Sequence, residues 1–320
     1  MKQIGSGGPG KSFREGISLI ELFGLFPDND TAECWLEDVR WDENGPMCPR
    51  CDKCDAVREV KSRKPMKWWC NTCRRNFSVR SGTVLAHSKI PLQKWVVGIY
   101  LQASSLKGVS SMKLHRDLKI TQKSAWFMAH RLREAMASEA GLFGGPVEVD
   151  ETFIGGLEKN KHASKKQHAG RGTVGKTAVA GMKDRETGQI KAQVVEDTSG
   201  PTLKQFVYDN TEWSATVYTD EHGAYRGMMD VEHETVNHSV SAYVNGMAHT
   251  NGLESFWSML KRGYHGTYHH MSPKHLHRYV KEFAGRHNLR DSDTIDQMRM
   301  IAAAAIGKRL MYRELVGQAK

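Results

Sequence analysis

The 320-residue sequence predicts an α/β (α+β) protein in which a mixed-sheet domain follows a small cysteine-rich ribbon and a helical segment. Two CxxC pairs lie close together after the first 45 residues. Apolar residues then recur at helical spacing, and short runs bounded by Gly, Pro or Ser dominate the second half, as is typical of strands. A chain of this length can bury a substantial core, so one large and one small domain are expected.

The charge distribution favours an anionic partner. The chain has 46 Lys and Arg against 36 Asp and Glu, a formal net charge of +10. Residues 1–45 hold nine acidic and four basic residues, whereas residues 60–116 hold twelve Lys or Arg and no Asp or Glu. A segment this one-sided is expected of nucleic-acid binding, and double-stranded DNA is the partner that we predict.

Neither a membrane nor a nucleotide cofactor is predicted as a partner. No run reaches the ~18–20 apolar residues of a membrane span, and the N-terminus lacks the apolar stretch of a secretory signal. We therefore expect a cytoplasmic protein with reduced thiols. Residues 5–12, GSGGPGKS, match the phosphate-loop pattern, but only four residues precede them. Because that motif needs a preceding strand, residues 1–12 are predicted to be a flexible leader, followed by a helical segment at 13–45.

Four cysteines are predicted to hold one structural Zn²⁺ ion in a ribbon at residues 46–85. The motifs CPRC and CNTC are separated by 18 residues, a spacing expected for a four-thiolate site. Tetrahedral zinc would close two turns of a domain too small to bury enough core by itself. The predicted ligands are Cys48, Cys51, Cys70 and Cys73.

The two remaining thiols leave an alternative open. Cys54 could pair with Cys51 and leave Cys48 free, although Pro49 suits a turn between Cys48 and Cys51. Cys34 lies in an amphipathic run and is predicted to be a buried thiol.

The middle segment, residues 86–143, is predicted to be helical and to resemble a DNA-binding helix-turn-helix. Residues 91–105 form a predicted helix with Pro in its first turn. Two further helices, at 110–118 and 122–136, are joined by a short turn, as in that motif. The second of them carries Lys123, His130, Arg131 and Arg133.

The second half of the chain, residues 144–290, has the element order β-β-β-α-β-(β)-α. This order predicts a ribonuclease-H-like mixed sheet with helices packed on it. Residues 291–320 are expected to add a final helix, with its apolar run at residues 299–315, that serves packing alone. The strands are predicted at 146–156, 176–186, 188–197 and 214–225, with a possible fifth at 232–239, and the helices at 199–211 and 251–262.

Three carboxylates are the candidate metal ligands of this half. Asp150 and Asp220 each close an apolar run, and Glu254 lies on a helix whose polar face also carries Asn251 and Lys261. Two strand carboxylates and one helix carboxylate that converge through the fold would suit two hard divalent cations.

Two neighbouring acids compete with Asp150 for this role. Strand alternation puts Glu148 on the same face of the sheet as Asp150 and Glu151 on the opposite face.

These motifs resemble those of insertion-sequence transposases of the DDE type, in the ISXO-like branch with an N-terminal zinc ribbon. The match extends over roughly residues 30–290. It is carried by CPRC and CNTC, by RSGTVLAHSKIPLQKW, and by VEVDETFIGG, VYTDEHGAY and HTNGLESFWSMLKRGYHG.

The resemblance implies DNA strand cleavage and transfer with two Mg²⁺ (or Mn²⁺) ions held by Asp150, Asp220 and a third residue. The third position of this branch is Glu or Asn, and the sequence has both Glu254 and Asn251. We choose Glu254 because an anionic oxygen is the better ligand for a hard cation, with Asn251 assisting. Lys261 is expected to contact a phosphate.

The predicted function is therefore that of a transposase that binds the terminal inverted repeats of its insertion sequence. Such a protein would be bacterial and nucleoid-associated, and at least a dimer on DNA because two element ends must be held together. Two alternatives stay open: a non-catalytic zinc-ribbon DNA-binding regulator, and a ribonuclease-H-like nuclease that releases ends without joining them.

Overall fold

The chain folds into two compact units in a computed structural model. One unit comprises Met1–Met136 and Leu289–Lys320, and the other comprises Ala137–Asn288. The finer division of the first unit into leader, ribbon and helical region stays a prediction. The expected leader lies outside the described residues, which are 15–41, 43, 45–52, 54–137, 141–156, 158–166, 172–220, 223–229, 231–236 and 251–317, without the side chains of residues 165 and 251.

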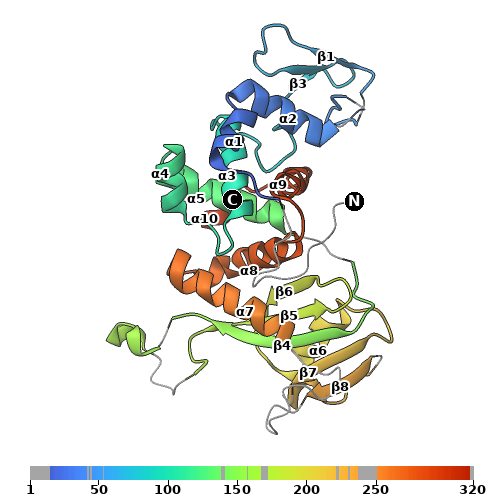
Figure 1. The fold of residues 1–320 in the computed structure, drawn as a ribbon, viewed down its shortest axis with the longest axis vertical. Coiled ribbons are helices and arrows are strands. Elements are labelled where there is room, and N and C mark those ends of the chain that lie inside the picture. Colours follow the sequence, from blue (N-terminus) through green and yellow to red (C-terminus); the bar gives the residue numbers. More distant parts are fainter. Residues whose placement is uncertain are drawn as a thin grey trace. The chain divides into compact units, whose positions relative to one another are not determined.

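The ribbon of the first unit is a small antiparallel sheet (Figure 1). Its strands β1 (Val57–Glu59), β2 (Trp68–Cys70) and β3 (Arg75–Phe77) pair in that order. Two helices, α1 (Leu19–Leu25) and α2 (Asn29–Trp41), precede it. Cys34 is exposed on α2, so the prediction of a buried thiol was wrong. The buried face of α2 is formed instead by Ala32, Trp35, Leu36 and Trp41.

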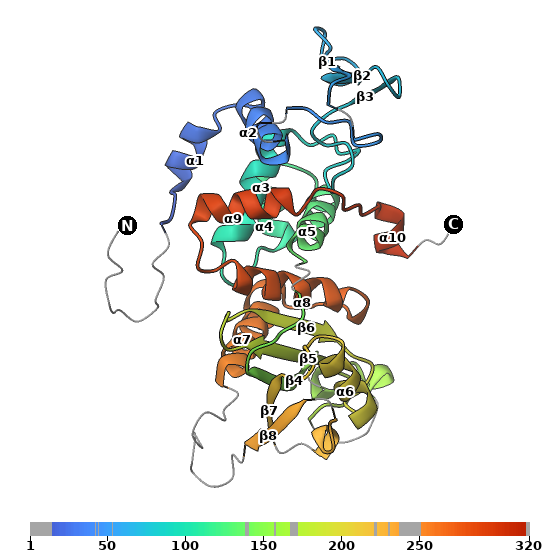
Figure 2. The ribbon, with the colours of Figure 1, turned by 90° about the vertical axis from the view of Figure 1, so that its right-hand side faces the viewer.

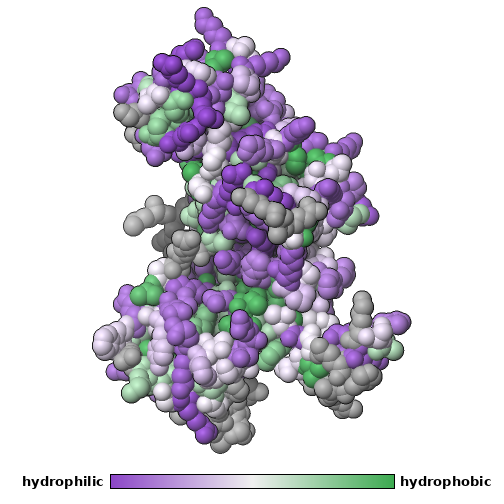
Figure 3. Space-filling view, turned by 180° about the vertical axis from the view of Figure 1, so that it is seen from behind, coloured by the Kyte–Doolittle hydropathy of each residue, from purple (hydrophilic) through white to green (hydrophobic). Residues whose placement is uncertain are grey.

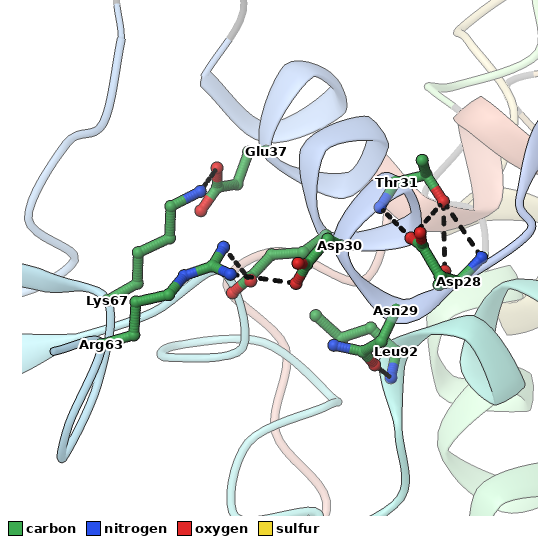
Figure 4. Close-up of polar contacts among 9 residues, drawn as sticks. Asp28, Asn29, Asp30, Thr31, Glu37, Arg63, Lys67 and Leu92 are labelled. Atoms are coloured by element: carbon green, nitrogen blue, oxygen red, sulfur yellow. Dashed lines mark hydrogen bonds and ion pairs between the residues drawn. The ribbon is translucent and has the colours of Figure 1, made fainter. Parts of the chain in front are cut away.

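Acidic side chains of α2 pair with the basic hairpin between β1 and β2 (Figure 4). Arg63 donates to Asp30 at 2.9 Å and to Glu33 at 3.0 Å, and Lys67 donates to Glu37 at 2.6 Å. Two of the twelve basic residues in the one-sided segment are thus neutralised within the chain. They are less available to an external anion than the sequence suggested.

Glu37 is partly buried, and it provides a test of how the hairpin is held. Its second oxygen accepts from Trp68 Nε1 at 2.8 Å. The substitution Glu37→Ala leaves the Lys67 ammonium and the indole N–H without this acceptor, and we expect it to lower the free energy of unfolding by about 1–3 kcal/mol. Denaturant unfolding of Glu37→Ala and of the exposed control Asp38→Ala measures the difference. Equal effects of the two substitutions would contradict this account.

Three helices form the centre of the first unit. They are α3 (Leu92–Ser104), α4 (Ser111–Leu118) and α5 (Gln122–Met136), at the predicted positions. Of the four basic residues noted on α5, Lys123 is exposed, whereas His130, Arg131 and Arg133 are buried. These three side chains therefore do not form an exposed DNA-reading face.

The C-terminal stretch is two helices, α9 (Thr294–Ala303) and α10 (Tyr312–Val316), where a single final helix was predicted. The chain between them pairs with the loop before α3. Val84 N donates to Ala305 O at 3.0 Å, and Gly307 N donates to Gly82 O at 2.9 Å. Backbone groups used in this pairing cannot continue a helix, and Gly307 takes the positive φ of +75° that ends the run.

The second unit is built on a five-stranded sheet of order β6-β5-β4-β7-β8 (Figure 1). The strands β4 (Val147–Ile154), β5 (Thr177–Asp184) and β6 (Ile190–Val194) form an antiparallel meander. The strand β7 (Thr216–Asp220) runs parallel to β4, and β8 (Glu232–Val236) runs parallel to β7. This is the predicted ribonuclease-H-like mixed sheet, with the possible fifth strand present.

Helices cover both faces of this sheet (Figure 2). On one face, Val147 and Val149 pack with Leu203 and Phe206 of α6 (Gly200–Tyr208). On the other face, Ile154 and Val179 pack against α7 (Asn251–Gly263) and α8 (Pro273–Asn288). The buried stripe of α8 comprises Leu276, Tyr279, Val280 and Phe283.

The described part of the loop between β4 and β5 contains two short 3₁₀ turns at Glu158–Asn160 and Ala163–Lys165. In the described part of the chain, no helix has the length and apolar character needed to cross a bilayer. Hydrophilic side chains cover most of the face drawn in Figure 3.

Candidate functional site

The four predicted zinc ligands lie together at the base of the ribbon. The Sγ atoms of Cys48 and Cys73 are 3.4 Å apart, those of Cys51 and Cys70 are 3.5 Å apart, and those of Cys51 and Cys73 are 3.9 Å apart. All four sulfur atoms lie within 4.8 Å of one another. Cys54 is exposed and outside this group, so the geometry favours Cys48 over Cys54 as the fourth ligand.

The cluster fits a tetrahedral zinc ion. Zn–S bonds of about 2.3 Å place sulfur atoms about 3.8 Å apart, close to the separations found. The backbone N–H of Cys73, together with the neighbouring thiols, lowers the pKa of the Cys70 thiol to about 6. A site that stabilises a thiolate is suited to a metal, because the thiolate is the ligand.

Removal of zinc should unfold the ribbon, since its three strands are each three residues long. We expect one zinc ion per chain by elemental analysis, and loss of it in Cys70→Ser. The matched control Cys54→Ser should keep its zinc and its melting temperature. Loss of zinc from Cys54→Ser would contradict the ligand set.

Two of the three candidate carboxylates lie on neighbouring parallel strands of the second unit. The register pairs Val147 with Val217 and Glu148 with Tyr218. Continued by two residues, it places Asp150 opposite Asp220, with both side chains on the face that α7 covers. Asp150 lies in the middle of β4, which extends four residues beyond it, whereas Asp220 is the last residue of β7.

Asp150 is held between the sheet and α7. Its Oδ2 accepts from Trp257 Nε1 at 3.0 Å, and its Oδ1 accepts from the backbone N–H of Glu151 at 2.8 Å. Burial, and then the negative charges of Glu151 and Asp220, raise the pKa of Asp150 to about 6, although the two hydrogen bonds oppose the shift. A cation bound next to this carboxylate would stabilise its ionised form and lower its pKa again, so Asp150 is suited to bind one.

The two acids that competed with Asp150 have other partners. Both oxygens of Glu148, which is 1% exposed, are used: Oε1 accepts from Arg185 Nε at 2.9 Å, and Oε2 from the N–H groups of Gly252 and Leu253 at 3.0 and 3.3 Å. Glu148 therefore caps the N-terminus of α7, where a carboxylate is stabilised by the helix dipole. Glu151, on the opposite face as predicted, accepts from the Tyr225 hydroxyl at 2.7 Å.

The remaining candidates all lie on α7. Glu254 is exposed in its first turn, and Lys261 is exposed in its last turn. Residues three apart are neighbours on a helix, so Glu254 lies on the side of α7 that carries Trp257. Asn251 is the first residue of α7, and its side chain is not among those described.

The three carboxylates do not form a compact cluster. Among the described residues, only the four cysteines form a group of three or more potential metal ligands whose atoms all lie within 4.8 Å of one another. Asp150, Asp220 and Glu254 thus share one side of the sheet but would have to move closer to bind a common ion.

Sequence reasoning missed the two residues that set the distance between α7 and the sheet. Gly181 pairs with Asp150 across β4 and β5. A Cβ atom at Gly181 would lie 2.6 Å from Cη2 of Trp257, so only glycine permits this approach. The N–H contact of Trp257 with Asp150 had no sequence signal.

The substitution Gly181→Ala should therefore push the Trp257 ring away and weaken its bond to Asp150. We expect a loss of about 1–3 kcal/mol in the free energy of unfolding, as for other overpacked cores. Chemical denaturation checks this, with Gly266→Ala as the control, because no atom lies within 4 Å of a Cβ at that position. An unchanged free energy of unfolding in Gly181→Ala would show that α7 is not held at this distance.

A mixed sheet of this order, with acidic residues in register on two neighbouring parallel strands, is compatible with the DDE-type transposase domains that the motifs resembled. Comparison with known proteins finds a matching family. Residues 142–288 match the family described as ISXO2-like transposase domain. The match covers nearly all of the second unit, so this unit is similar to the transposase domains of that family.

One relative extends over most of the chain. It is a protein of Halobacterium salinarum, described as an uncharacterized protein in transposable element ISH50. The two are 28% identical over 238 residues, which are 71% of this chain and 80% of that protein. This similarity reaches beyond the matched domain, because 238 residues exceed the 147 residues of the range 142–288.

Proposed function

We propose that the protein binds the terminal inverted repeats of its insertion sequence and catalyses metal-dependent cleavage and transfer of DNA strands. The observation that carries the proposal is the register of Asp150 and Asp220 on neighbouring parallel strands, under the helix that carries Glu254. The similarity of residues 142–288 to the ISXO2-like transposase domain supports the same activity. We further propose that the protein acts in the bacterial cytoplasm, on the nucleoid, and as at least a dimer, because two element ends must be joined.

Asp150, Asp220 and Glu254 would hold two Mg²⁺ or Mn²⁺ ions, since hard cations prefer carboxylate oxygens. Two ions held by these carboxylates would supply activation of the attacking water or 3′-hydroxyl and stabilisation of the leaving 3′-oxygen. Trp257 Nε1 donates to Oδ2 of Asp150 and thereby fixes the orientation of the carboxylate. Lys261, which is exposed two turns beyond Glu254, would contact a phosphate of the bound strand.

Substitution of the three carboxylates tests this proposal. Asp150→Asn, Asp220→Asn and Glu254→Gln should each reduce Mg²⁺-dependent cleavage of a duplex that carries the element end by roughly 10²–10³-fold, because each removes an anionic metal ligand. Asn251→Ala should reduce it less. An active Glu254→Gln beside an inactive Asn251→Ala would make Asn251 the third ligand. Full activity of all four variants would reject the catalytic proposal.

The products of the same reaction separate the two alternatives. A ribonuclease-H-like nuclease releases 3′-ends that are never joined to a target duplex. A non-catalytic regulator binds the duplex and leaves it intact with every metal ion.

The pKa of Asp150 predicts how metal binding depends on pH. Because that pKa is raised to about 6, the carboxyl is protonated below about pH 6 and protons compete with the metal there. We expect Mg²⁺ affinity and cleavage to fall about tenfold for each pH unit below this point. The substitution Glu151→Gln removes a negative charge that raises this pKa, so the midpoint should move to lower pH. Calorimetric Mg²⁺ titrations of the parent and of Glu151→Gln over a pH series measure the affinity and its midpoint. An unchanged midpoint in Glu151→Gln would contradict the assignment of this pH dependence to Asp150.

A further inference from the structure

Arg131, on α5 in the first unit, is a buried cation without a counter-ion. It is 7% exposed, and its Nε atom has no hydrogen-bond partner. In the described part of the chain no carboxylate forms an ion pair with it, and its guanidinium carbon lies 4.0 Å from the centre of the Phe127 ring. Burial lowers the pKa of Arg131 to about 10, so the group is still charged at neutral pH.

Such an arrangement is costly in the free protein. A buried charge loses its hydration, and a cation–π contact of this kind offsets only part of that loss. A buried cation of this kind is normally compensated by an anion. Because the described residues supply none, the compensating group is expected to come from a ligand.

Two adjoining clefts give an anion access to Arg131. One, of about 280 Å³, lies between α5 and the segment that leads into α10. The other, of about 540 Å³, lies between α5, the turn that precedes it and the loop before α3. Both are lined by His87, Phe127 and Arg131, so the guanidinium lies where the two clefts meet.

The lining of both clefts suits an anion. The charged or titratable side chains are basic: Lys89 and Lys119 line the larger cleft, Arg309 lines the smaller, and His87 lines both. No Asp or Glu is among the described residues that line either cleft. The N-terminus of α5 also borders the larger cleft through Thr121 and Ser124, and no acidic residue lies in the first turn of α5. Its helix dipole therefore adds further positive potential.

We propose that this Arg131 cleft binds a backbone phosphate of duplex DNA. The inference rests on the proposed DNA-binding function and assigns a phosphate site to it. Arg131 provides the donors, and Lys89 and Lys119 lie where they meet the flanking phosphates. This role differs from the exposed reading face expected for α5, because the contact is made at the bottom of a cleft rather than by a protruding helix surface.

Binding of the full-length protein to a labelled mixed-sequence DNA duplex, without added Mg²⁺, tests the proposal. Arg131→Met should weaken binding by roughly tenfold or more and reduce the slope of log K against log[salt] by about 1, as expected for the loss of one phosphate contact. Arg131→Lys should keep the salt slope and bind with intermediate affinity. The control Lys113→Met removes a lysine that is already paired with Asp117 at 2.6 Å, and it should bind DNA as the parent does.

The melting temperature of the free protein separates a binding role from a structural one. Since Arg131 lacks a counter-ion, Arg131→Met should melt at or above the temperature of the parent. A lower melting temperature would make the guanidinium a structural group and would overturn the proposal. Unchanged DNA affinity and salt slope in Arg131→Met would overturn it as well.

Inorganic phosphate distinguishes the source of the anion. If phosphate raises the melting temperature of the parent but not of Arg131→Met, while both bind duplex DNA equally, the site holds free phosphate and the DNA assignment is wrong. The assay needs no metal ion, so its outcome is separate from that of the carboxylate variants. Arg131-dependent DNA binding, together with no strand cleavage after Mg²⁺ or Mn²⁺ is added, would reject the catalytic proposal alone.

Discussion

The close approach of α7 to the sheet is the constraint on which the candidate active site depends. Gly181 lacks the side chain that would separate the two elements, and the Trp257 ring fills the space above it. The indole N–H then reaches Asp150, and Glu148 accepts the first N–H groups of the helix. A helix displaced by one side chain could not make these contacts. Glu254, which belongs to the same helix, would then lie farther from the strand carboxylates.

The buried charges of this protein differ in how completely they are compensated. Glu148 has both oxygens bonded to Arg185 and to a helix N-terminus, which is typical of a structural role. Asp150 has two hydrogen bonds but a raised pKa, and Arg131 has an unbonded Nε atom. Glu148 stabilises the fold, whereas the charges of Asp150 and Arg131 are incompletely neutralised in the free protein. Incomplete compensation of a buried charge is the common physical basis of the two proposed binding sites.

Local sequence patterns predicted most of the elements. The strands β4 to β8 and the helices α6 and α7 lie where alternation and helical spacing placed them, because each buries one face or stripe. The CxxC spacing predicted the four clustered thiols. Patterns failed where pairing with distant segments decided the structure. The final helix is interrupted because residues 305–307 pair with residues 82–84, and Cys34 is exposed because other residues of α2 face the core.

Periodicity, spacing and residue chemistry were enough to predict the mixed sheet, the four-cysteine ribbon and the identity of the candidate carboxylates. Which of the acids have structural partners was settled by the tertiary structure. It bonded Glu148 to a helix and Glu151 to Tyr225, and it buried Arg131 beneath two clefts. The physical reason is that the compensation of a charge depends on partners far away in the chain, and these meet only when the packed elements bring them together.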